Sequence, residues 1–305
     1  MIVVYGTVCL DLLHRVDFLP QKGGYTEITE EIHMLGGEAA NTAAALVRWG
    51  ADTTLVGNPI GQGAQADLLA ALLRQHGLGQ ALLPHADHAA PVCHIFVTPD
   101  GQRTMFGRGF AEMEKRCDPA LAPLPAGSWF TADPNHGKKA REAIALASKA
   151  GMKIYLLDFV RDDETVPVGA IWQSSTAWVG RFGDAQHNCD WVSRWLEQHD
   201  CFGILTDGVN GFVAGSREFG VHKYPAVDIP DSVDSTGAGD MFRAGVLFGL
   251  AAGWEIAQCF TFASTAAAFN CRKLGAIGGL ESKQMIDAFL ADHPEVAGHY
   301  ESAKR

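Results

Sequence analysis

The sequence predicts an α/β fold in which a central, mostly parallel sheet is flanked by helices and accompanied by a small separate β-sheet. Strand-like and helix-like segments alternate along most of the 305 residues, which is typical of a sheet covered by helices on both faces. Two segments depart from this alternation because they read as strands with no helix after them. We find no internal repeat or long linker, and we expect residues 1–305 to form a single domain.

The core elements are predicted from short apolar runs and from helical spacing. The apolar run at 2–6 predicts a first strand, and Leu68, Leu69, Leu72 and Leu73 recur at the spacing of one helix face. The same criteria predict further strands near 53–57, 129–132, 154–159, 177–179 and 202–206. They predict helices at 39–49, 67–76, 137–150, 184–199 and from 237 to about 272, with a break near Gly253.

The small sheet is predicted from two separate insertions, at about 13–34 and 92–107. The second contains Pro99-Asp100-Gly101, a good hairpin signal because Asp-Gly tolerates the positive φ of a tight turn. An exposed small sheet has edges and an apolar face that need covering. This sheet is therefore expected either to close over a ligand or to pair with a second copy, through residues such as His94, Phe96, Met105 and Arg108.

Composition excludes several classes of function. The formal charge is −11 and there is no basic run, which argues against a nucleic-acid partner. The longest uncharged apolar stretch, residues 244–254, is too short to span a bilayer, and no leader pattern opens the chain, so we expect a cytoplasmic protein. The seven cysteines form no C-x-x-C pair, and the histidines show no metal-hydrolase spacing, so free thiols and no zinc site are expected.

The segment 234–240, Asp-Ser-Thr-Gly-Ala-Gly-Asp, carries the clearest chemistry. The N–H groups of Gly237, Ala238 and Gly239 would point out of a helix N-terminus, where the helix dipole favours negative charge. Such a cradle suits a phosphoryl group in a transition state, and Asp240 beside it could accept the proton of an attacking hydroxyl. Taken alone, the segment is more typical of a glycine-rich helix cap whose aspartate complements the dipole.

Five segments in order along the chain resemble the ribokinase-like (pfkB) sugar kinases. Residues 234–247 are similar to the C-terminal signature of that family, and residues 36–43, Gly-Gly-Glu-Ala-Ala-Asn-Thr-Ala, to its N-terminal signature. The others are Asp11 after the first strand, the turn 206–211 and the hairpin segment 101–104. One such match would be weak, but five in order from residue 6 to about 280 favour catalytic work for Asp240.

The resemblance implies a β-sheet lid, ATP, magnesium and in-line transfer of the γ-phosphoryl group to a substrate hydroxyl. It implies that Asp240 is the base, that Gly237, Ala238 and Gly239 form the anion hole, and that lids pair in a homodimer. The residues that it assigns to the acceptor are Asp11, Gly37, Glu38, Asn41 and Arg103. Those assigned to the nucleotide are Thr206, Gly208 and Gly211, and a potassium-type site is placed near Asp234.

One departure from the family pattern concerns an N-x-x-E motif after the strand expected at 177–179. Arg181 and Asp184 fall at its spacing. Asp184 could replace the glutamate as a metal ligand, whereas Arg181 is a cationic donor that either contacts a nucleotide phosphate or lies in solvent. The stretch 61–66 also replaces the usual G-x-D-x-x-G. These two changes lean toward the ketohexokinase branch.

A second departure is Glu38, at a position that is often lysine, asparagine or a small residue in the family. If it faces the pocket, then Asp11, Glu38 and Asp240 make the acceptor site negative and exclude phosphorylated or carboxylated sugars. We therefore expect a neutral ketose, aldose, polyol or nucleoside. The alternative is a glutamate that only complements the helix dipole and points away.

Three other functions remain as alternatives. A nucleoside kinase of the same fold would need no change in the catalytic residues. A non-catalytic sugar or nucleotide sensor would explain the altered motif at Arg181 and Asp184. A dinucleotide-dependent oxidoreductase is suggested by the G-x-G-x-x-A pattern of residues 61–66, although Asn58-Pro59-Ile60 lengthens a turn that should be tight.

Overall fold

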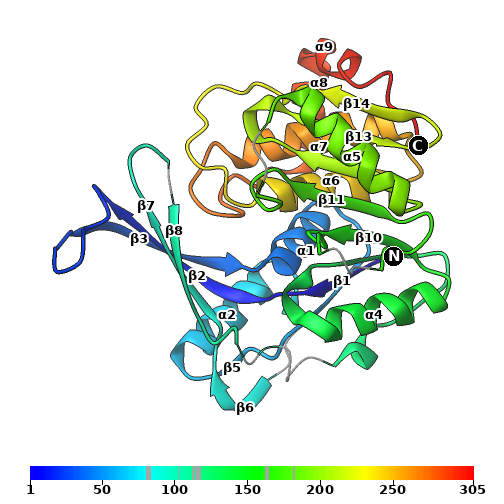
Figure 1. The fold of residues 1–305 in the computed structure, drawn as a ribbon. Coiled ribbons are helices and arrows are strands. Elements are labelled where there is room, and N and C mark those ends of the chain that lie inside the picture. The colour runs from blue at the N-terminus through cyan, green and yellow to red at the C-terminus, as the bar shows by residue number, and fades with distance from the viewer. Residues whose placement is uncertain (80–83, 102, 112, 114–117, 162–164, 181–182) are drawn as a thin grey trace.

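The computed structural model describes residues 1–305 except 80–83, 102, 112, 114–117, 162–164 and 181–182. Figure 1 shows a large layered α/β body, with a small sheet that projects from one side of it. The predicted fold class is confirmed. No helix in the described part of the chain is long and apolar enough to cross a membrane.

The main sheet has eight strands in the described residues, in the order β14-β13-β12-β11-β10-β9-β1-β4. The six from β4 to β12 are parallel, and the hairpin β13–β14 adds an antiparallel edge. Parallel strands need a crossover between them, which explains the alternation of strands and helices in the sequence. Their bounds are β1 Ile2–Gly6, β4 Thr53–Gly57, β9 Trp129–Ala132, β10 Lys153–Leu157, β11 Ile171–Ser175, β12 Phe202–Thr206, β13 Phe212–Ser216 and β14 Gly220–Tyr224.

Helices cover both faces of this sheet and create two apolar cores. Successive side chains of β1 alternate between them: Ile2 and Val4 enter one core, whereas Val3 and Tyr5 enter the other. The first core lies against α1, α2, α6, α7 and α8, and the second against α4 and α5. The helices are α1 Glu38–Arg48, α2 Ala64–Gln75, α4 Gly137–Lys149, α5 Ala185–Gln198, α6 Ala238–Ala251, α7 Ile256–Asn270, α8 Lys283–Asp292 and α9 Glu295–Gly298.

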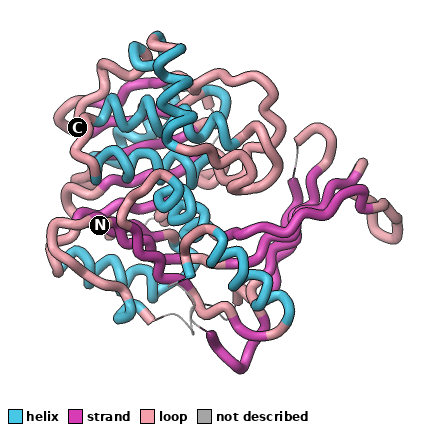
Figure 2. Tube along the Cα trace, turned by 180° about the vertical axis from the view of Figure 1, so that it is seen from behind, coloured by secondary structure: helices cyan, strands magenta, loops and turns pink. Residues whose placement is uncertain are grey.

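The small sheet combines two segments that are far apart in the sequence. Its order is β3-β2-β7-β8, with β2 paired antiparallel to β3 and parallel to β7. Figure 2 shows that these strands leave the body as one ribbon-like layer. The strands are β2 Cys9–Val16, β3 Ile28–Gly36, β7 Val92–Val97 and β8 Arg103–Arg108, and a short pair joins β5 Gly61–Gln62 to β6 Pro84–Ala89. That this sheet acts as a lid stays a prediction.

The strand expected at 177–179 is wrong. Strand β11 ends at Ser175, and residues 176–180 form a turn. The sequence conceals β11 because Gln173 and Ser174 are polar although they are buried. The Gln173 side chain accepts a hydrogen bond from the Tyr155 hydroxyl, and the Ser174 hydroxyl donates to Asp158 at 2.7 Å. The spacing that singled out Arg181 and Asp184 was therefore counted from the wrong strand end.

Helices α6 and α7 approach so closely that Gly245 has no room for a side chain. A Cβ atom there would lie 2.5 Å from the Ala263 Cα. We predict that Gly245→Ala lowers the free energy of unfolding by about 1–3 kcal/mol, because overpacking outweighs the better helix propensity of alanine. Gly298→Ala in α9 is the control, since its new Cβ would meet nothing within 4 Å. Urea unfolding measures both, and an equal effect of the two changes would contradict this account.

Candidate active site

The candidate site lies at the carboxyl ends of the parallel strands, where the N-termini of α1 and α6 meet. Thr7 follows β1, Asp133 follows β9 and Asp158 follows β10. In open α/β sheets, ligands bind outside this edge. Thr7 and Asp133 join two neighbouring strands there, because the Thr7 N–H and hydroxyl donate to the Asp133 carboxylate at 2.8 and 3.1 Å.

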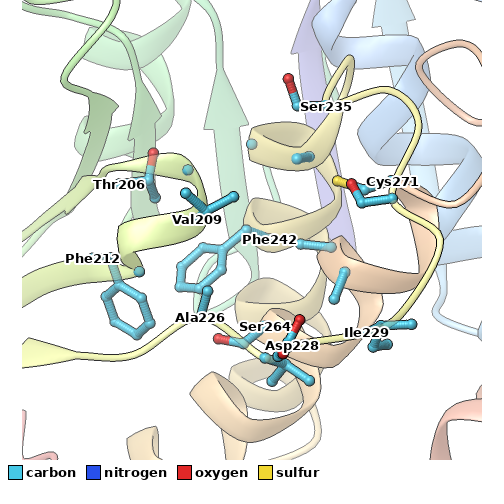
Figure 3. Close-up of a pocket in the computed structure, with 18 residues that line it drawn as sticks. Thr206, Val209, Phe212, Ala226, Asp228, Ile229, Ser235, Phe242, Ser264 and Cys271 are labelled. Atoms are coloured by element: carbon cyan, nitrogen blue, oxygen red, sulfur yellow. The ribbon is translucent and has the colours of Figure 1, made fainter. Parts of the chain in front are cut away.

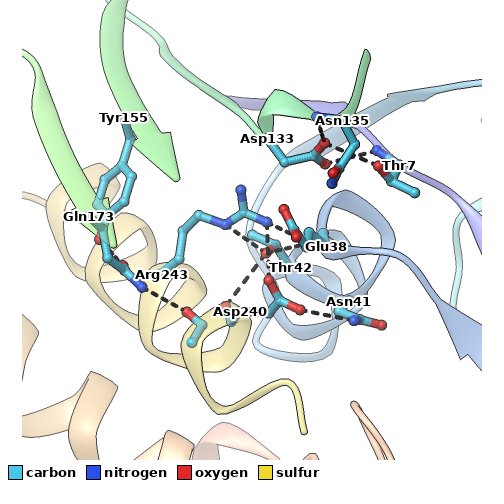
Figure 4. A network of polar contacts seen from close by, with 11 residues as sticks. Thr7, Glu38, Asn41, Thr42, Asp133, Asn135, Tyr155, Gln173, Asp240 and Arg243 are labelled. Atoms are coloured by element: carbon cyan, nitrogen blue, oxygen red, sulfur yellow. Dashed lines mark hydrogen bonds and ion pairs between the residues drawn. The ribbon is translucent and has the colours of Figure 1, made fainter. Parts of the chain in front are cut away.

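Asp240 is buried in the first turn of α6 and contacts α1. Its Oδ2 accepts a hydrogen bond from the Asn41 side chain at 2.9 Å, and its Oδ1 lies 3.4 Å from Arg243 Nη2 (Figure 4). Burial raises the pKa of Asp240 to about 6, whereas Arg243 and the Asn41 hydrogen bond oppose that rise. A carboxylate with this pKa is suited to exchange a proton near neutral pH.

The start of α6 is fixed by Gly237. This residue has a φ of 74°, and a Cβ would lie 2.2 Å from the Ala276 carbonyl oxygen, so only glycine fits. The Ala238 N–H donates to Ser235 O at 3.2 Å. The N–H groups of Gly239 and Asp240 follow in the first turn, where no intrahelical acceptor exists, and can face an anion. Of the three residues predicted for the anion hole, Gly237 shapes the turn and Gly239 presents its N–H, whereas the Ala238 N–H is occupied by Ser235 O; the anion-hole role stays a prediction.

Asp11 on β2 is buried rather than exposed, and it faces the same space as Asp240. Its Oδ1 accepts a hydrogen bond from the Cys9 thiol at 3.3 Å. Gly36 leaves room for this carboxyl, because a Cβ there would lie 2.1 Å from its atoms. Burial, and then the charge of Asp240, raises the pKa of Asp11 to about 7. Asp11, Asn41 and Asp240 thus meet at one place although they come from distant parts of the chain.

The carboxyl group of Glu38, in the first turn of α1, is turned toward the interior. Burial raises its pKa well above the usual value, and Asp133, Asp158 and Asp240 raise it further. Its Oε2 is buried and has no hydrogen-bond partner among the described residues. Of the two orientations considered from the sequence, the structure shows the one in which the carboxyl faces the site, and its raised pKa favours the protonated form there.

Three residues of this site were not predicted from the sequence: Asp133, Asp158 and Arg243. Asp133 and Asp158 are acids that directly follow buried strands, which was a usable signal. Asp158 has a positive φ of 61°, and burial raises its pKa to about 7. Arg243 is a charged residue within an apolar helix, and its location beside Asp240 follows only from the register of α6.

A cavity of about 240 Å³ connects the other predicted residues (Figure 3). Thr206, Gly208 and Gly211 line it from the β12–β13 turn, and Ala238 and Gly239 line it from the start of α6. Its remaining wall is largely apolar and includes Val209, Phe212, Ala226, Val227, Ile229, Phe242, Ala267 and Ala268. One ligand can therefore place an apolar ring between the turn and α7 and an anionic group at the N-terminus of α6.

Arg103 connects the small sheet to this site. From β8, its Nη1 donates to Thr236 Oγ1 at 3.0 Å and to Ser235 Oγ at 3.5 Å. Ser235 and Thr236 immediately precede the turn from Gly237 to Gly239 that is predicted to bind an anion. The small sheet thus reaches the loop that leads into α6.

The predicted metal and cation residues have structural partners. Asp234 accepts hydrogen bonds from the Thr236 N–H, the Thr236 hydroxyl and the Gly275 N–H, at 2.9, 2.6 and 2.8 Å. Asp184 caps α5 by accepting from the His187 N–H at 2.8 Å. Arg181 lies outside the described residues. In the described ranges no three His, Cys, Asp or Glu side chains converge to hold a metal ion. Magnesium fits such a site when it arrives on nucleotide phosphates, because it then needs only one or two protein carboxylates.

Comparison with known proteins gives a consistent result. The family model described as pfkB family carbohydrate kinase matches residues 1–123 and 176–283. An uncharacterized sugar kinase of Dictyostelium discoideum is 26% identical over 95% of this chain and 97% of its own length. A nucleoside kinase of Methanocaldococcus jannaschii is 24% identical over 96% and 97%. The structure of Arabidopsis thaliana ribokinase complexed with ribose and ATP has a TM-score of 0.76 at 18% identity, covering 95% of this chain and 98% of that one.

Gly37 and Gly63 provide a matched test of the close approach at α1. Both are helix N-caps, with φ values of 95° and 93°. A Cβ on Gly37 would lie 2.3 Å from the Thr7 carbonyl oxygen, whereas one on Gly63 would meet nothing within 4 Å. We predict that Gly37→Ala lowers the free energy of unfolding by about 1–3 kcal/mol more than Gly63→Ala, because the first adds overpacking to the same backbone strain. Equal losses in denaturant unfolding would show that α1 tolerates displacement.

Proposed function

We propose that this chain, which belongs to the pfkB family of carbohydrate kinases, transfers the γ-phosphoryl group of ATP to a hydroxyl of a small uncharged sugar, with Asp240 as the base. The family establishes ATP-dependent phosphorylation of a sugar or nucleoside. The observation that carries the finer proposal is the continuity of the 240 Å³ cavity with the α6 N-terminus, beside which Asp240 is held. The oxidoreductase alternative is wrong, because residues 61–66 lie within the kinase match.

The apolar part of the cavity suits the adenine ring, and the first turn of α6 suits the phosphates. Thr206, Gly208 and Gly211 would contact the nucleotide from the β12–β13 turn. The N–H groups of the segment from Gly237 to Gly239 would stabilise the charge that develops on the transferred group. Magnesium, when bound to the nucleotide, would neutralise phosphate charge. Asp184 remains the proposed protein ligand for it, and Asp234 for a monovalent cation.

The acceptor would lie between the small sheet and the two helix N-termini. Asp11 can accept hydrogen bonds from neighbouring hydroxyls, and the Asn41 amide oxygen is buried without a partner among the described residues. Gly37 lets the backbone approach the ligand. The Asp11 and Asp240 carboxyls, together with Glu38 when it is ionised, disfavour a sugar acid or a sugar phosphate relative to an uncharged acceptor.

The chemical step follows from these positions. The acceptor hydroxyl oxygen attacks the γ-phosphorus, the bond to the bridging oxygen of ADP breaks, and the hydroxyl proton passes to Asp240. Asn41 keeps the carboxylate oriented through the hydrogen bond to its Oδ2. Closure of the small sheet, with Arg103 bound to Thr236, would exclude water that could otherwise accept the phosphoryl group.

The outer face of the same sheet is proposed to form a homodimer. Phe106 on β8 is 58% exposed and stacks edge-on against Phe96 on β7. His14 and His94 stack beside them. An aromatic face of this kind is stabilised when a second copy covers it.

Asp240→Asn tests the base directly. We expect kcat to fall by about 100- to 10,000-fold, because asparagine cannot take the hydroxyl proton. The assay follows ATP consumption with magnesium across ketoses, aldoses, polyols and nucleosides. The kcat/KM of the native protein should rise with pH through about 6, as Asp240 loses its proton, and then level off.

The control is Asp67→Asn, an exposed aspartate in the first turn of α2, which should leave turnover unchanged. A fast nucleoside would select the nucleoside kinase alternative, which relatives such as the Methanocaldococcus jannaschii protein favour. Binding of sugar without turnover by any compound would select the sensor.

The charge of the acceptor site gives a separate prediction. The kcat/KM for a sugar acid such as gluconate should be at least about tenfold below that for the matching uncharged polyol, because the carboxylates repel it. Glu38→Gln should narrow this difference mainly at high pH, where the native Glu38 carboxyl, whose pKa is raised, is ionised. Saturation by gluconate at low concentration in the native protein would contradict an uncharged acceptor.

A further inference from the structure

Arg243 is a fully buried cation in the apolar helix α6, one turn after Asp240. Its exposed fraction is 0%, and burial of an arginine is rare unless its charge is matched. Nη2 lies 3.4 Å from Asp240 Oδ1 and also donates to the Glu38 carbonyl oxygen. Nε donates to the Thr42 hydroxyl at 2.9 Å. Figure 4 shows this guanidinium between α6 and the first turns of α1.

The same group faces three carboxyls of the site. Burial raises the pKa of Glu38, Asp158 and Asp240, and the Arg243 charge lowers the pKa of each. These carboxyls come from α1, the end of β10 and α6. Arg243 is therefore close enough to all three carboxyls to favour their ionised forms.

Other charged groups act on Asp240 from the remaining elements around it. Asp133 at the end of β9 raises its pKa, and Arg103 on β8 lowers it, by less than Arg243 does. Asp11 on β2 interacts with it as well. Arg103 is more exposed and belongs to the small sheet, whereas Arg243 is fixed by hydrogen bonds inside the body. The permanent positive charge beside the base is thus that of Arg243.

We propose that Arg243 is a positioning residue for phosphoryl transfer, whose guanidinium ties the base-bearing helix α6 to the acceptor-bearing helix α1 and supplies the positive charge that the Asp240 carboxylate faces. This inference rests on the proposed role of Asp240. The Arg243 guanidinium donates to the Thr42 hydroxyl and to the Glu38 carbonyl oxygen. Thr42 directly follows Asn41, whose side chain donates to Oδ2 of Asp240. Both carboxylate oxygens of Asp240 are thereby held by the same part of α1, one directly by Asn41 and the other through Arg243.

The test is the pH profile of kcat/KM for Arg243→Met and Arg243→Lys. An opposite charge within about 4–6 Å lowers the pKa of a carboxyl by about 1–3 units. In Arg243→Met, the apparent pKa of the acid limb, below which kcat/KM falls, should therefore rise by that amount. Relative to the variant's own high-pH plateau, a shift of about two units from a pKa near 6 lowers activity about tenfold at pH 7 and leaves almost no loss at pH 9, while the lost guanidinium hydrogen bonds lower that plateau. Arg243→Lys keeps the charge, and its acid limb should stay within about one unit of the native one.

Two controls separate electrostatics from structure. Arg194→Met removes an exposed arginine of α5 and should change neither the limb nor the plateau. Thr42→Val removes one hydrogen bond of the Arg243 guanidinium but leaves its charge in place. It should therefore lower the high-pH plateau of kcat/KM without changing the apparent pKa of the acid limb. Thermal unfolding of every variant confirms that the profiles are measured on folded protein.

The outcomes distinguish this inference from the function on which it rests. Full activity of Asp240→Asn would overturn the proposed base. An inactive Asp240→Asn together with a native acid limb in Arg243→Met would overturn only the role of Arg243. A loss of activity in Arg243→Met that is equal at every pH would also overturn it, since that result indicates damage to packing rather than loss of a charge.

Discussion

The hydrogen bond from Asn41 to Asp240 joins residues that are 199 positions apart, and the site depends on it. It forms only because the N-termini of α1 and α6 approach closely over the carboxyl edge of the sheet. Glycines permit that approach on both sides: Gly37 lies against the Thr7 carbonyl, and Gly237 lies against the Ala276 carbonyl. Backbone positions without a side chain therefore decide where Asn41 and Asp240 can meet.

Much of the fold could be predicted from the sequence, because buried parallel strands appear as short apolar runs and helices as periodic ones. Strand β11 was misplaced because it buries Gln173 and Ser174, whose partners, Tyr155, Gly239 and Asp158, lie in other elements. A polar strand of this kind is recognisable only when the groups that satisfy it are known.

The residues of the candidate site likewise differ in how far the sequence alone predicts them. Residues in contiguous motifs, such as those around Asn41 and Asp240, could be identified from spacing. For Asp133 and Asp158 the sequence shows acids that follow apolar strands, but that these acids meet the other residues depends on the strand order β10-β9-β1, which short-range patterns do not encode. Burying these acids also has a thermodynamic effect. The raised pKa values of Asp11, Asp158 and Asp240 mean that the folded protein binds more protons than the unfolded chain between about pH 4 and 7, so these groups make it less stable as pH rises.

The contact between Arg103 and Thr236 links two binding events that are usually considered separately. Arg103 belongs to strand β8 of the small sheet, whereas Thr236 belongs to the loop that leads into the first turn of α6. A ligand that holds the sheet against the body therefore also restrains that loop. Thermodynamic reciprocity then requires that whatever factor the acceptor exerts on nucleotide affinity, the nucleotide exerts on acceptor affinity. On the proposed placement of acceptor and nucleotide, this arginine–threonine contact would couple the occupancy of the two sites.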